Sequence, residues 1–201
     1  MLSAQELIIM DYLDTFKMAD ERSLLEDLSV IQELKDILFK LRDSGLINRT
    51  DEGLWEITKT GETAVEKARK MLLEQCTRKE EFLNYCKEFE VINNRFKSLI
   101  SKWQVKEVNG RLIPNVHDDP EYDFSILEQL NKVHEETKDL ISRIANIFPI
   151  YERFIKRLDV TWERINNGNF EYIDVARNSY HNIWFELHES LLKLSGMKRI
   201  E

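Results

Sequence analysis

The sequence predicts a mainly α-helical protein, with an N-terminal winged helix followed by an antiparallel helical bundle. The 201 residues include only 6 Gly and 3 Pro, so few positions interrupt a helix. Apolar residues recur at helical spacing along most of the chain. Two short segments within residues 46–58 instead alternate apolar and polar side chains, which indicates a β-hairpin. We expect a winged-helix domain over residues 1–74 and a four-helix domain over residues 75–201.

Three helices are expected before the hairpin. The first covers residues 4–17 and the second, a short one, covers residues 21–28. Ser29 suits the N-cap of the third helix, and Gly45 suits the position just after its end. The apolar face of this third helix is expected to contain Val30, Leu34, Leu38 and Leu41.

The hairpin follows the third helix directly. Segments 46–49 and 54–58 would form its strands, joined by a polar turn that contains Gly53. Thr60 and Gly61 then open a further helix. Three helices closed by a hairpin correspond to a winged helix.

The second domain is expected to consist of four long amphipathic helices, which favours an antiparallel bundle. The first of them covers residues 78–104, and a loop with an Asn109-Gly110 turn follows it. The second helix is expected to begin at Ser125, which would form a capping box with Glu128. The last two helices are expected over residues 149–166 and 173–194.

Composition and charge exclude several classes of protein. No apolar segment approaches the roughly 18–20 residues of a membrane span, and Met1 to Met10 lack the features of a secretory signal. Cys76 and Cys86 are ten residues apart and form no CxxC pattern, so we expect them to be reduced thiols of a cytoplasmic protein. The net charge of −8 disfavours indiscriminate nucleic-acid binding.

The third helix would be the recognition helix of a helix-turn-helix that lies in the DNA major groove. The expected DNA contacts come from this helix and the hairpin: Ser29, Gln32, Lys35, Lys40 and Arg49. Residues 1–76 contain ten basic and sixteen acidic residues, so we expect modest, salt-sensitive binding that depends on dimerisation. Phe39 also faces outward, which is natural for a protein contact. A winged helix used for dimerisation or domain contacts is therefore the alternative.

Several polar side chains fall on the apolar faces of the bundle helices. Asn93, His134 and Tyr180 lie within these faces, with His181 and His188 at the edge beside Trp184 and Phe185. They predict either an internal hydrogen-bond network or a polar pocket for a ligand.

A metal site is a weaker alternative for the same residues. His181 and His188 are two helical turns apart, so both reach one ion only if another ligand stands between them. Glu186 and Glu189 are expected on the other side of that helix, where Glu189 could pair with Lys193. No nucleophile–base pair, phosphate loop or carboxylate dyad is recognisable, so the sequence predicts neither an enzyme nor a cofactor.

The hairpin region resembles the wing of MarR/PadR-like winged-helix regulators, which read GLI…W-x-L-T-x-x-G. A larger set of residues resembles a regulator family common in actinobacteria, with the approximate pattern N…WQ…NDHxDxxYD…H…SYHxVWFELHEDLL. The matching residues are Asn93, Trp103-Gln104, residues 115–123, His134 and residues 179–192. Val116 and Ser190 depart from the pattern, since acidic residues occupy both positions in the family.

The resemblance implies a dimeric transcription regulator whose second domain senses a small effector and whose partner is double-stranded DNA. A similar region is attached to some phosphoenolpyruvate-utilising proteins, so a regulatory module without DNA binding is the alternative. The predicted ligand-binding residues combine both lines of argument: Asn93, Gln104, Asn115, His117, His134, Tyr180, His181, Trp184 and His188.

Overall fold

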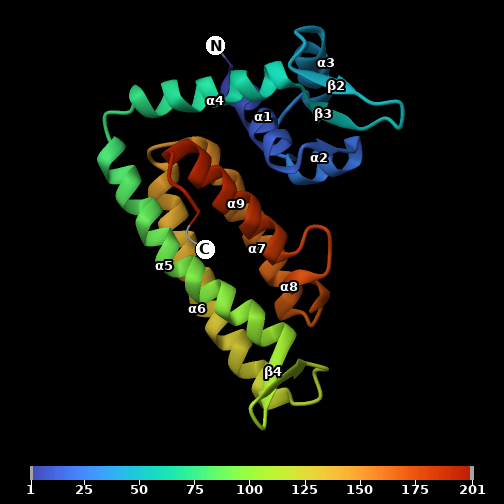
Figure 1. Ribbon diagram of the computed structural model, residues 1–201, viewed down its shortest axis with the longest axis vertical. Coiled ribbons are helices and arrows are strands. Elements are labelled where there is room, and N and C mark those ends of the chain that lie inside the picture. Colours follow the sequence, from blue (N-terminus) through green and yellow to red (C-terminus); the bar gives the residue numbers. More distant parts are fainter. Residues whose placement is uncertain (1, 200–201) are drawn as a thin grey trace. The chain divides into compact units, whose positions relative to one another are not determined.

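The computed structural model describes residues 2–199 and is mainly helical, with 69% helix and 8% strand, which confirms the mainly α prediction. The chain divides into two compact units (Figure 1). The first contains the described residues up to Lys79 and those from Trp184 onward, and the second contains Glu80–Ile183. None of the described helices is long and apolar enough to cross a membrane. The expected domain boundary at residue 74 remains a prediction.

The first unit begins with α1 (Ala4–Phe16), β1 (Met18–Ala19), α2 (Glu21–Asp27) and α3 (Leu34–Asp43). Ser3 and Glu6 form a capping box at the start of α1, and Asp20 caps α2. These caps satisfy the backbone N–H groups that a helix leaves free in its first turn.

Three short strands form one antiparallel sheet in the order β1-β3-β2. Strands β2 (Ile47–Arg49) and β3 (Trp55–Ile57) pair where the sequence predicts a hairpin, with Ile47 opposite Ile57. Strand β1 was not expected, because two residues are too few to produce an alternating pattern. It pairs with β3 through Ala19 opposite Trp55, so the sheet connects the chain after α1 with the hairpin.

Helix α4 (Lys59–Glu74) packs against α1 within the first unit. Arg69 of α4 is buried and donates hydrogen bonds to Asp11 at 2.6 Å and to Asp14 at 2.7 Å. Thr58 caps α4 by accepting a hydrogen bond from the backbone N–H of Gly61 at 3.0 Å. The Thr58 hydroxyl also donates to the carbonyl of Gly45 at 2.8 Å, which joins the end of the hairpin to the end of α3.

Helix α3 begins later than the sequence indicated. Ser29 does not cap it, since residues 28–30 and 32–33 form turns and the helix starts at Leu34. Glu33 has a left-handed backbone with φ of 55°, which interrupts the helical path before that point. Val30 is consequently exposed, although it was expected on the apolar face, and Ile31 is buried in its place.

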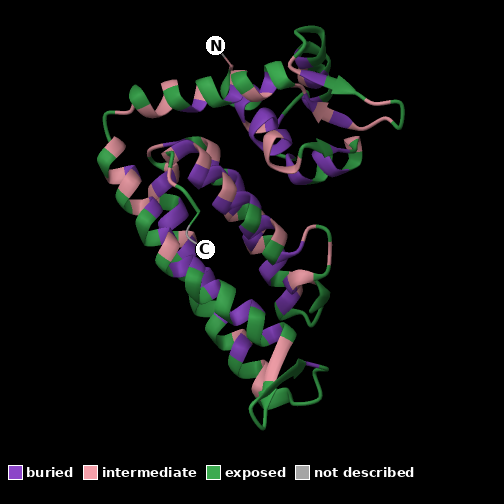
Figure 2. Cartoon of the chain, in the orientation of Figure 1, coloured by how far each residue is buried: buried purple, intermediate pink, exposed green. Residues whose placement is uncertain are grey.

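The second unit consists mainly of α5 (Lys79–Gln104, from Glu80 onward), α6 (Pro120–Ala145) and α7 (Glu152–Asn166, preceded by a 3₁₀ turn over Pro149–Tyr151). Ion pairs join Glu88 with Arg143 and Arg95 with Glu136, so α5 and α6 run in opposite directions along each other. Helix α6 also packs against α7. Buried residues recur along all three helices and alternate with exposed ones (Figure 2).

Two boundaries in this unit correct the sequence predictions. Helix α6 begins at Pro120 with Asp119 as its N-cap, so Ser125 lies inside the helix and does not start it. Proline at the first helical position needs no N–H partner, which explains the earlier start. The expected fourth helix is interrupted and consists of α8 (Glu171–Asp174) and α9 (Tyr180–Ser195).

The loop expected over residues 105–123 contains a second hairpin, formed by β4 (Val105–Val108) and β5 (Arg111–Pro114). Asn109 and Gly110 form its two-residue turn, with φ of 53° and 75°. Two successive positive φ angles are typical of a type I′ turn, for which Asn-Gly is the preferred sequence.

Candidate functional site

Lys35 of α3 and Arg49 of β2 meet at one carboxylate. The Nζ atom of Lys35 lies 2.6 Å from Oε1 of Glu21, and Arg49 lies 4.0 Å from Oε2 of the same side chain. The hydrogen bond from Lys35 lowers the pKa of Glu21. The fold thus brings a helix cation and a hairpin cation to the same anionic group.

An exposed aromatic side chain lies beside this group. Phe39 is 38% exposed, and its ring meets the edge of Trp55 at a centroid distance of 5.6 Å. The guanidinium group of Arg42 lies 4.9 Å above the Phe39 ring, and that of Arg49 lies 5.3 Å above Trp55. Lys35, Phe39 and Arg42 are spaced four and three residues apart, so they follow one face of α3.

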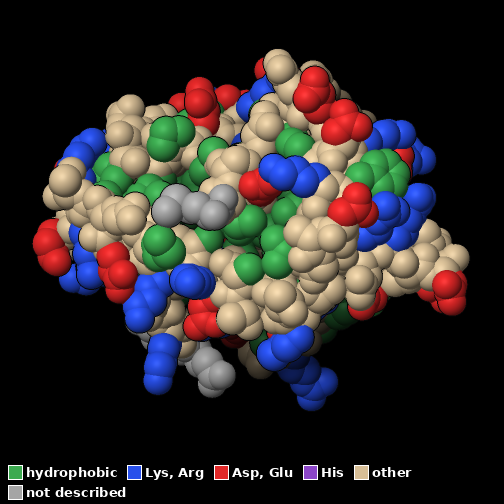
Figure 3. All heavy atoms as spheres, turned by 90° about the horizontal axis from the view of Figure 1, so that it is seen from above, with side chains coloured by type: hydrophobic (Ala, Val, Ile, Leu, Met, Phe, Trp, Pro, Cys, Tyr) green, Lys and Arg blue, Asp and Glu red, His purple; other side chains and the backbone are tan. Residues whose placement is uncertain are grey.

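The other predicted DNA contacts lie elsewhere in the first unit. Ser29 and Gln32 are exposed in the turns before α3, so Gln32 does not belong to the recognition helix as expected. Lys40 pairs with Glu6 at 2.7 Å. Burial alone would raise the pKa of Glu6, but the hydrogen bonds from Lys40 and Ser3 lower it. Figure 3 shows basic side chains beside acidic ones over the face in view.

His134 lies at the centre of a buried polar cluster in the second unit. Its Nδ1 atom is 3.1 Å from the hydroxyl of Tyr180, and its Nε2 atom is 3.2 Å from Oδ1 of Asp159. Asp159 also accepts from Lys138 at 2.8 Å, and the ring of Trp162 stacks on the imidazole at 5.2 Å. These contacts assign the proton of a neutral His134 to Nε2, so that Nδ1 accepts from Tyr180.

Burial sets the protonation of this cluster. It lowers the pKa of His134, even though the carboxylate of Asp159 acts in the opposite direction. It also raises the pKa of Tyr180, which therefore remains a hydroxyl donor. The cluster joins the first turn of α9 to α6 and α7 and is neutral at its centre.

A second polar cluster surrounds His117, which is exposed and has a left-handed backbone with φ of 58°. Its Nδ1 atom lies 3.0 Å from Oδ2 of Asp123, and its ring packs on Trp103 at a centroid distance of 4.3 Å. Asn115 is buried and donates to Oδ1 of Asp123 at 2.9 Å and to the carbonyl of Trp103 at 3.1 Å. Asp123 thus orients the imidazole through Nδ1, and no hydrogen bond of Nε2 occurs within residues 2–199.

The remaining predicted ligand residues are distributed over several places. Asn93 is buried beside the carboxylate of Glu90, from which its Nδ2 atom lies 3.3 Å. Gln104 donates to Asp174 at 2.7 Å. His181 is exposed, although partial desolvation lowers its pKa, and its ring lies 6.1 Å from that of Phe96.

Trp184 and His188 are buried in the part of α9 that belongs to the first unit. The structure therefore places His134 with Tyr180, and Asn115 with His117, but it does not assemble all nine residues in one described site.

The predicted outer face of α9 requires a correction. Glu186 is fully buried, because it follows the buried Ile183 by three residues and precedes the buried Ser190 by four. Glu189 pairs with Arg199 at 2.6 Å, and not with Lys193 as expected. Lys193 instead reaches Asp14 of α1 at 3.0 Å.

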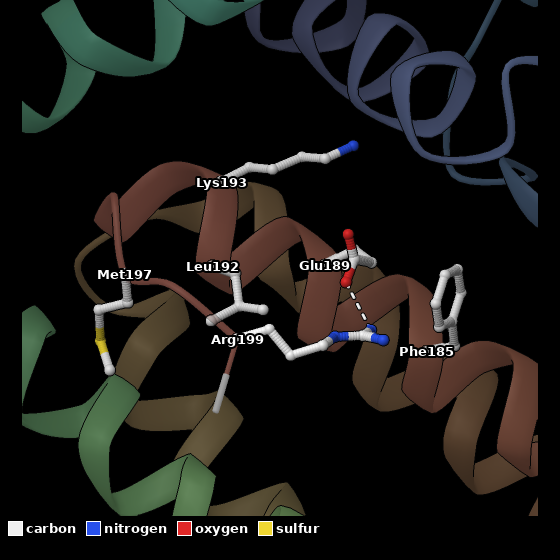
Figure 4. A pocket seen from close by; sticks show the side chains of 6 residues that line it. All are labelled: Phe185, Glu189, Leu192, Lys193, Met197 and Arg199. Atoms are coloured by element: carbon white, nitrogen blue, oxygen red, sulfur yellow. Dashed lines mark hydrogen bonds and ion pairs between the residues drawn. The ribbon is translucent and has the colours of Figure 1, made fainter. Parts of the chain in front are cut away.

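Phe185, Glu189, Leu192, Lys193, Met197 and Arg199 line an open pocket of about 460 Å³ on this face of α9 (Figure 4). None of the predicted ligand residues belongs to it.

Sequence reasoning missed the partners that complete both clusters of the second unit. The helical spacing of Asp159 and Lys138 does not mark them as site residues. Only the packing of α6 against α7 brings them to His134. Asp123 and Trp103 belong to the segments that resemble the regulator family, so this resemblance was the available signal. Within the described part of the chain, no group of three or more His, Cys, Asp or Glu side chains is placed to hold a metal ion.

Comparison with known proteins does not identify a relative. The chain matches no protein-family model, no curated protein and no solved structure.

Proposed function

We propose that the first unit is a winged helix that binds double-stranded DNA and that the protein is a dimeric transcription regulator. The observation that carries this proposal is the convergence of Lys35 and Arg49 on Glu21. One cation comes from the helix that would enter the major groove, and the other comes from the hairpin that would contact the backbone.

A DNA phosphate offers the same chemistry as the carboxylate between these cations. Both groups present two oxygens that share negative charge, and both accept hydrogen bonds from Lys and Arg. On binding, a phosphate would replace Glu21 between Lys35 and Arg49. The element order α1-β1-α2-α3-β2-β3 and the sheet order β1-β3-β2 support the assignment.

The same ion pairs explain why the affinity should be modest. DNA must displace carboxylates from Lys35, Arg49 and Lys40 before it gains its own contacts. The acidic excess of the first 76 residues adds long-range repulsion. Binding should therefore weaken as salt is added. The logarithm of the binding constant should fall with the logarithm of the salt concentration, with a slope of about −0.9 for each phosphate neutralised.

The second unit would sense the effector. The His134–Tyr180 pair and Asn93 are its best-placed polar groups, because all three are buried on the helix faces that form the core of this unit. A ligand that competes for the hydroxyl of Tyr180 would alter the start of α9 and so the part of the helix that belongs to the first unit.

The test is a fluorescence-anisotropy titration of the protein with DNA from upstream of its own gene, at several salt concentrations. The double variant Lys35→Ala/Arg49→Ala should lose most of the affinity for DNA. The salt dependence of its binding constant should decrease by the amount expected for about two lost phosphate contacts. Lys59→Ala is the matched control, since Lys59 is exposed on α4 and pairs with Glu62. Absence of binding at low salt, or equal loss in the control, would refute DNA binding.

Phe39 favours a second candidate function, a protein-interaction module without DNA binding. An exposed aromatic ring beside an Arg side chain suits a protein contact as well as a groove contact. In that case Phe39→Ala would weaken capture of a partner, for which a phosphoenolpyruvate-utilising enzyme is the first to test, and Lys35→Ala would not.

A further inference from the structure

One end of the second unit exposes a concentration of apolar side chains. We call it the hairpin end and define it as residues 105–124 and 168–177. It contains half of the fourteen large hydrophobic side chains that are exposed in the described chain. These seven are Val108, Leu112, Ile113, Val116, Phe124, Phe170 and Val175. Exposed apolar residues that occur singly need no explanation, but such a concentration indicates an interaction surface.

Specific contacts hold the two segments of the hairpin end together. The ring of Phe170 meets Trp103 at a centroid distance of 5.7 Å, and Gln104 donates to Asp174 at 2.7 Å. The contacts connect the end of α5 with Asp174 of α8 and with Phe170, the residue before α8, and β4 follows α5 directly (Figure 1). The apolar side chains therefore belong to one end of one compact unit.

The β4–β5 hairpin contributes exposed surface on both of its faces. Ile113 lies opposite Lys106 on one face, and Leu112 lies opposite Glu107 on the other. All four residues of β5 are exposed. The type I′ turn and the ion pair between Lys106 and Asp118, at 2.5 Å, hold the hairpin in place. An isolated two-stranded hairpin is marginal in water, so a partner that covers it would add stability.

The charge around the apolar side chains is strongly acidic. The hairpin end contains seven acidic residues and three basic ones, Lys106, Arg111 and Arg177. Asp118 already neutralises Lys106. This excess repels nucleic acids and anionic membranes and favours a positively charged partner.

His117 adds a directional group to this surface. When Nδ1 donates to Asp123, the lone pair of the neutral imidazole is on Nε2, which can then accept a hydrogen bond from a partner. Lys and Arg side chains are donors without acceptor capacity, so they match both this nitrogen and the surrounding carboxylates. His117 also has a left-handed backbone, a conformation that is rare for residues other than glycine.

We propose that the hairpin end is a docking surface for a basic amphipathic helix of another protein. The apolar side of that helix would cover Leu112, Val116 and Val175, and its Lys and Arg side chains would reach the acidic residues and Nε2 of His117. This docking surface is independent of DNA binding by the first unit, since it involves only residues of the second unit.

The probe is a fluorescently labelled synthetic amphipathic helix of Leu and Lys, and its counterpart of Leu and Glu measures the role of charge. We expect the full-length protein to bind the Lys peptide in a saturable titration and the Glu peptide at least tenfold more weakly. Equal binding of the two peptides would overturn the proposal, as would no binding of the Lys peptide.

Substitutions locate the binding surface. The triple variant Leu112→Ser/Val116→Ser/Val175→Ser changes side chains that are 69–79% exposed, so it should fold normally and bind the Lys peptide at least tenfold more weakly. His117→Ala should weaken binding by a few-fold, as expected for one lost hydrogen bond. Val91→Ser is the matched control, because Val91 is 64% exposed on α5 of the same unit but outside the hairpin end. Wild-type affinity of the triple variant, or an equal loss in the control, would overturn the proposal.

Discussion

A Cβ atom on Gly61 would lie only 2.1 Å from the carbonyl oxygen of Leu46. The start of α4 therefore lies directly against the start of the hairpin, and only a residue without a side chain permits this approach. The same oxygen accepts a hydrogen bond from the Thr58 hydroxyl at 3.1 Å. This contact explains in physical terms why a glycine ends the W-x-L-T-x-x-G pattern that the sequence resembles.

The first prediction concerns this contact. Gly61→Ala should destabilise the first unit by about 1–3 kcal/mol, since backbone atoms must move to admit the methyl group. On an open helix position the same substitution would stabilise the protein. The free energy of unfolding, measured by urea titration followed by circular dichroism, tests this. Thr60→Ala, an exposed change on the same turn of α4, is the control and should stay near the wild type. A Gly61→Ala protein as stable as the wild type would contradict the close approach.

The second prediction concerns the carboxylate between the two cations. Glu21→Gln should tighten DNA binding by up to about fivefold, because it frees Lys35 and Arg49 from an exposed ion pair worth at most about 1 kcal/mol. Anisotropy titrations at low salt measure the change. Glu26→Gln removes a carboxylate from the same helix that pairs with Arg22, so it should have a smaller effect. Equal gains from both variants would indicate a general effect of net charge and not replacement of Glu21 by phosphate.

The third prediction concerns Asp14, which receives hydrogen bonds from Arg69 and Lys193. Burial would raise the pKa of Asp14, but these partners lower it from 3.8 to about 2. A carboxylate whose folded pKa is depressed stabilises the fold above its unfolded pKa, and the contribution is lost as the pH falls through the folded value. Asp14→Asn should therefore cost about 2 kcal/mol at neutral pH, and the difference should shrink between about pH 4 and pH 2.

Urea titrations of the wild type and of Asp14→Asn across that range provide the measurement. Asp43→Asn is a suitable control, since Asp43 forms an exposed pair with its neighbour Arg42. A cost that does not change with pH would contradict the electrostatic origin of the stabilisation.

The fourth prediction concerns His134, whose pKa is lowered by burial. Below the usual value of 6.5 the unfolded imidazole takes up a proton more readily than the folded one does. The unfolded state then binds more protons, so the free energy of unfolding should decrease as the pH falls from about 7.5 to about 5. Protonation would also remove the lone pair that accepts from Tyr180.

His134→Gln should flatten this pH dependence, although it also destabilises the protein at neutral pH. His181→Gln is the informative comparison, because the pKa of His181 is lowered in the same direction while its ring is exposed. Identical slopes for the wild type and His134→Gln would show that His134 does not control the dependence.

Periodicity located most helices but could not locate where some of them begin. The start of α3 depends on the left-handed backbone of Glu33, and no side-chain pattern encodes that angle. The start of α6 could have been predicted, since Asp119-Pro120 is a strong signal for a helix start. Ser125 and Glu128 formed a second candidate, a capping box, and the prediction followed that one. Local rules identify candidate caps, and packing decides between them.

The polar clusters show a similar division. Burial of Asn93, His134 and Tyr180 followed from their place in the apolar stripes. The partner of His134 did not, because Asp159 lies on another helix and is partly exposed. The prediction that Glu186 lies on the outer side of α9 was wrong, because Glu186 shares a helix face with the buried Ile183 and Ser190.

Helix α9 belongs to both units, with its first four residues in the second and the rest in the first. During synthesis on the ribosome, the second unit is therefore complete once Ile183 has emerged. The first unit must wait for Lys193 to reach Asp14, a closure over nearly the whole chain. A second unit that has already folded lowers the entropic cost of this closure, because most of the residues between Asp14 and Lys193 are then already compact. Vectorial folding should thus proceed from the inserted unit to the unit that surrounds it in sequence, and pulse proteolysis of stalled nascent chains would reveal that order.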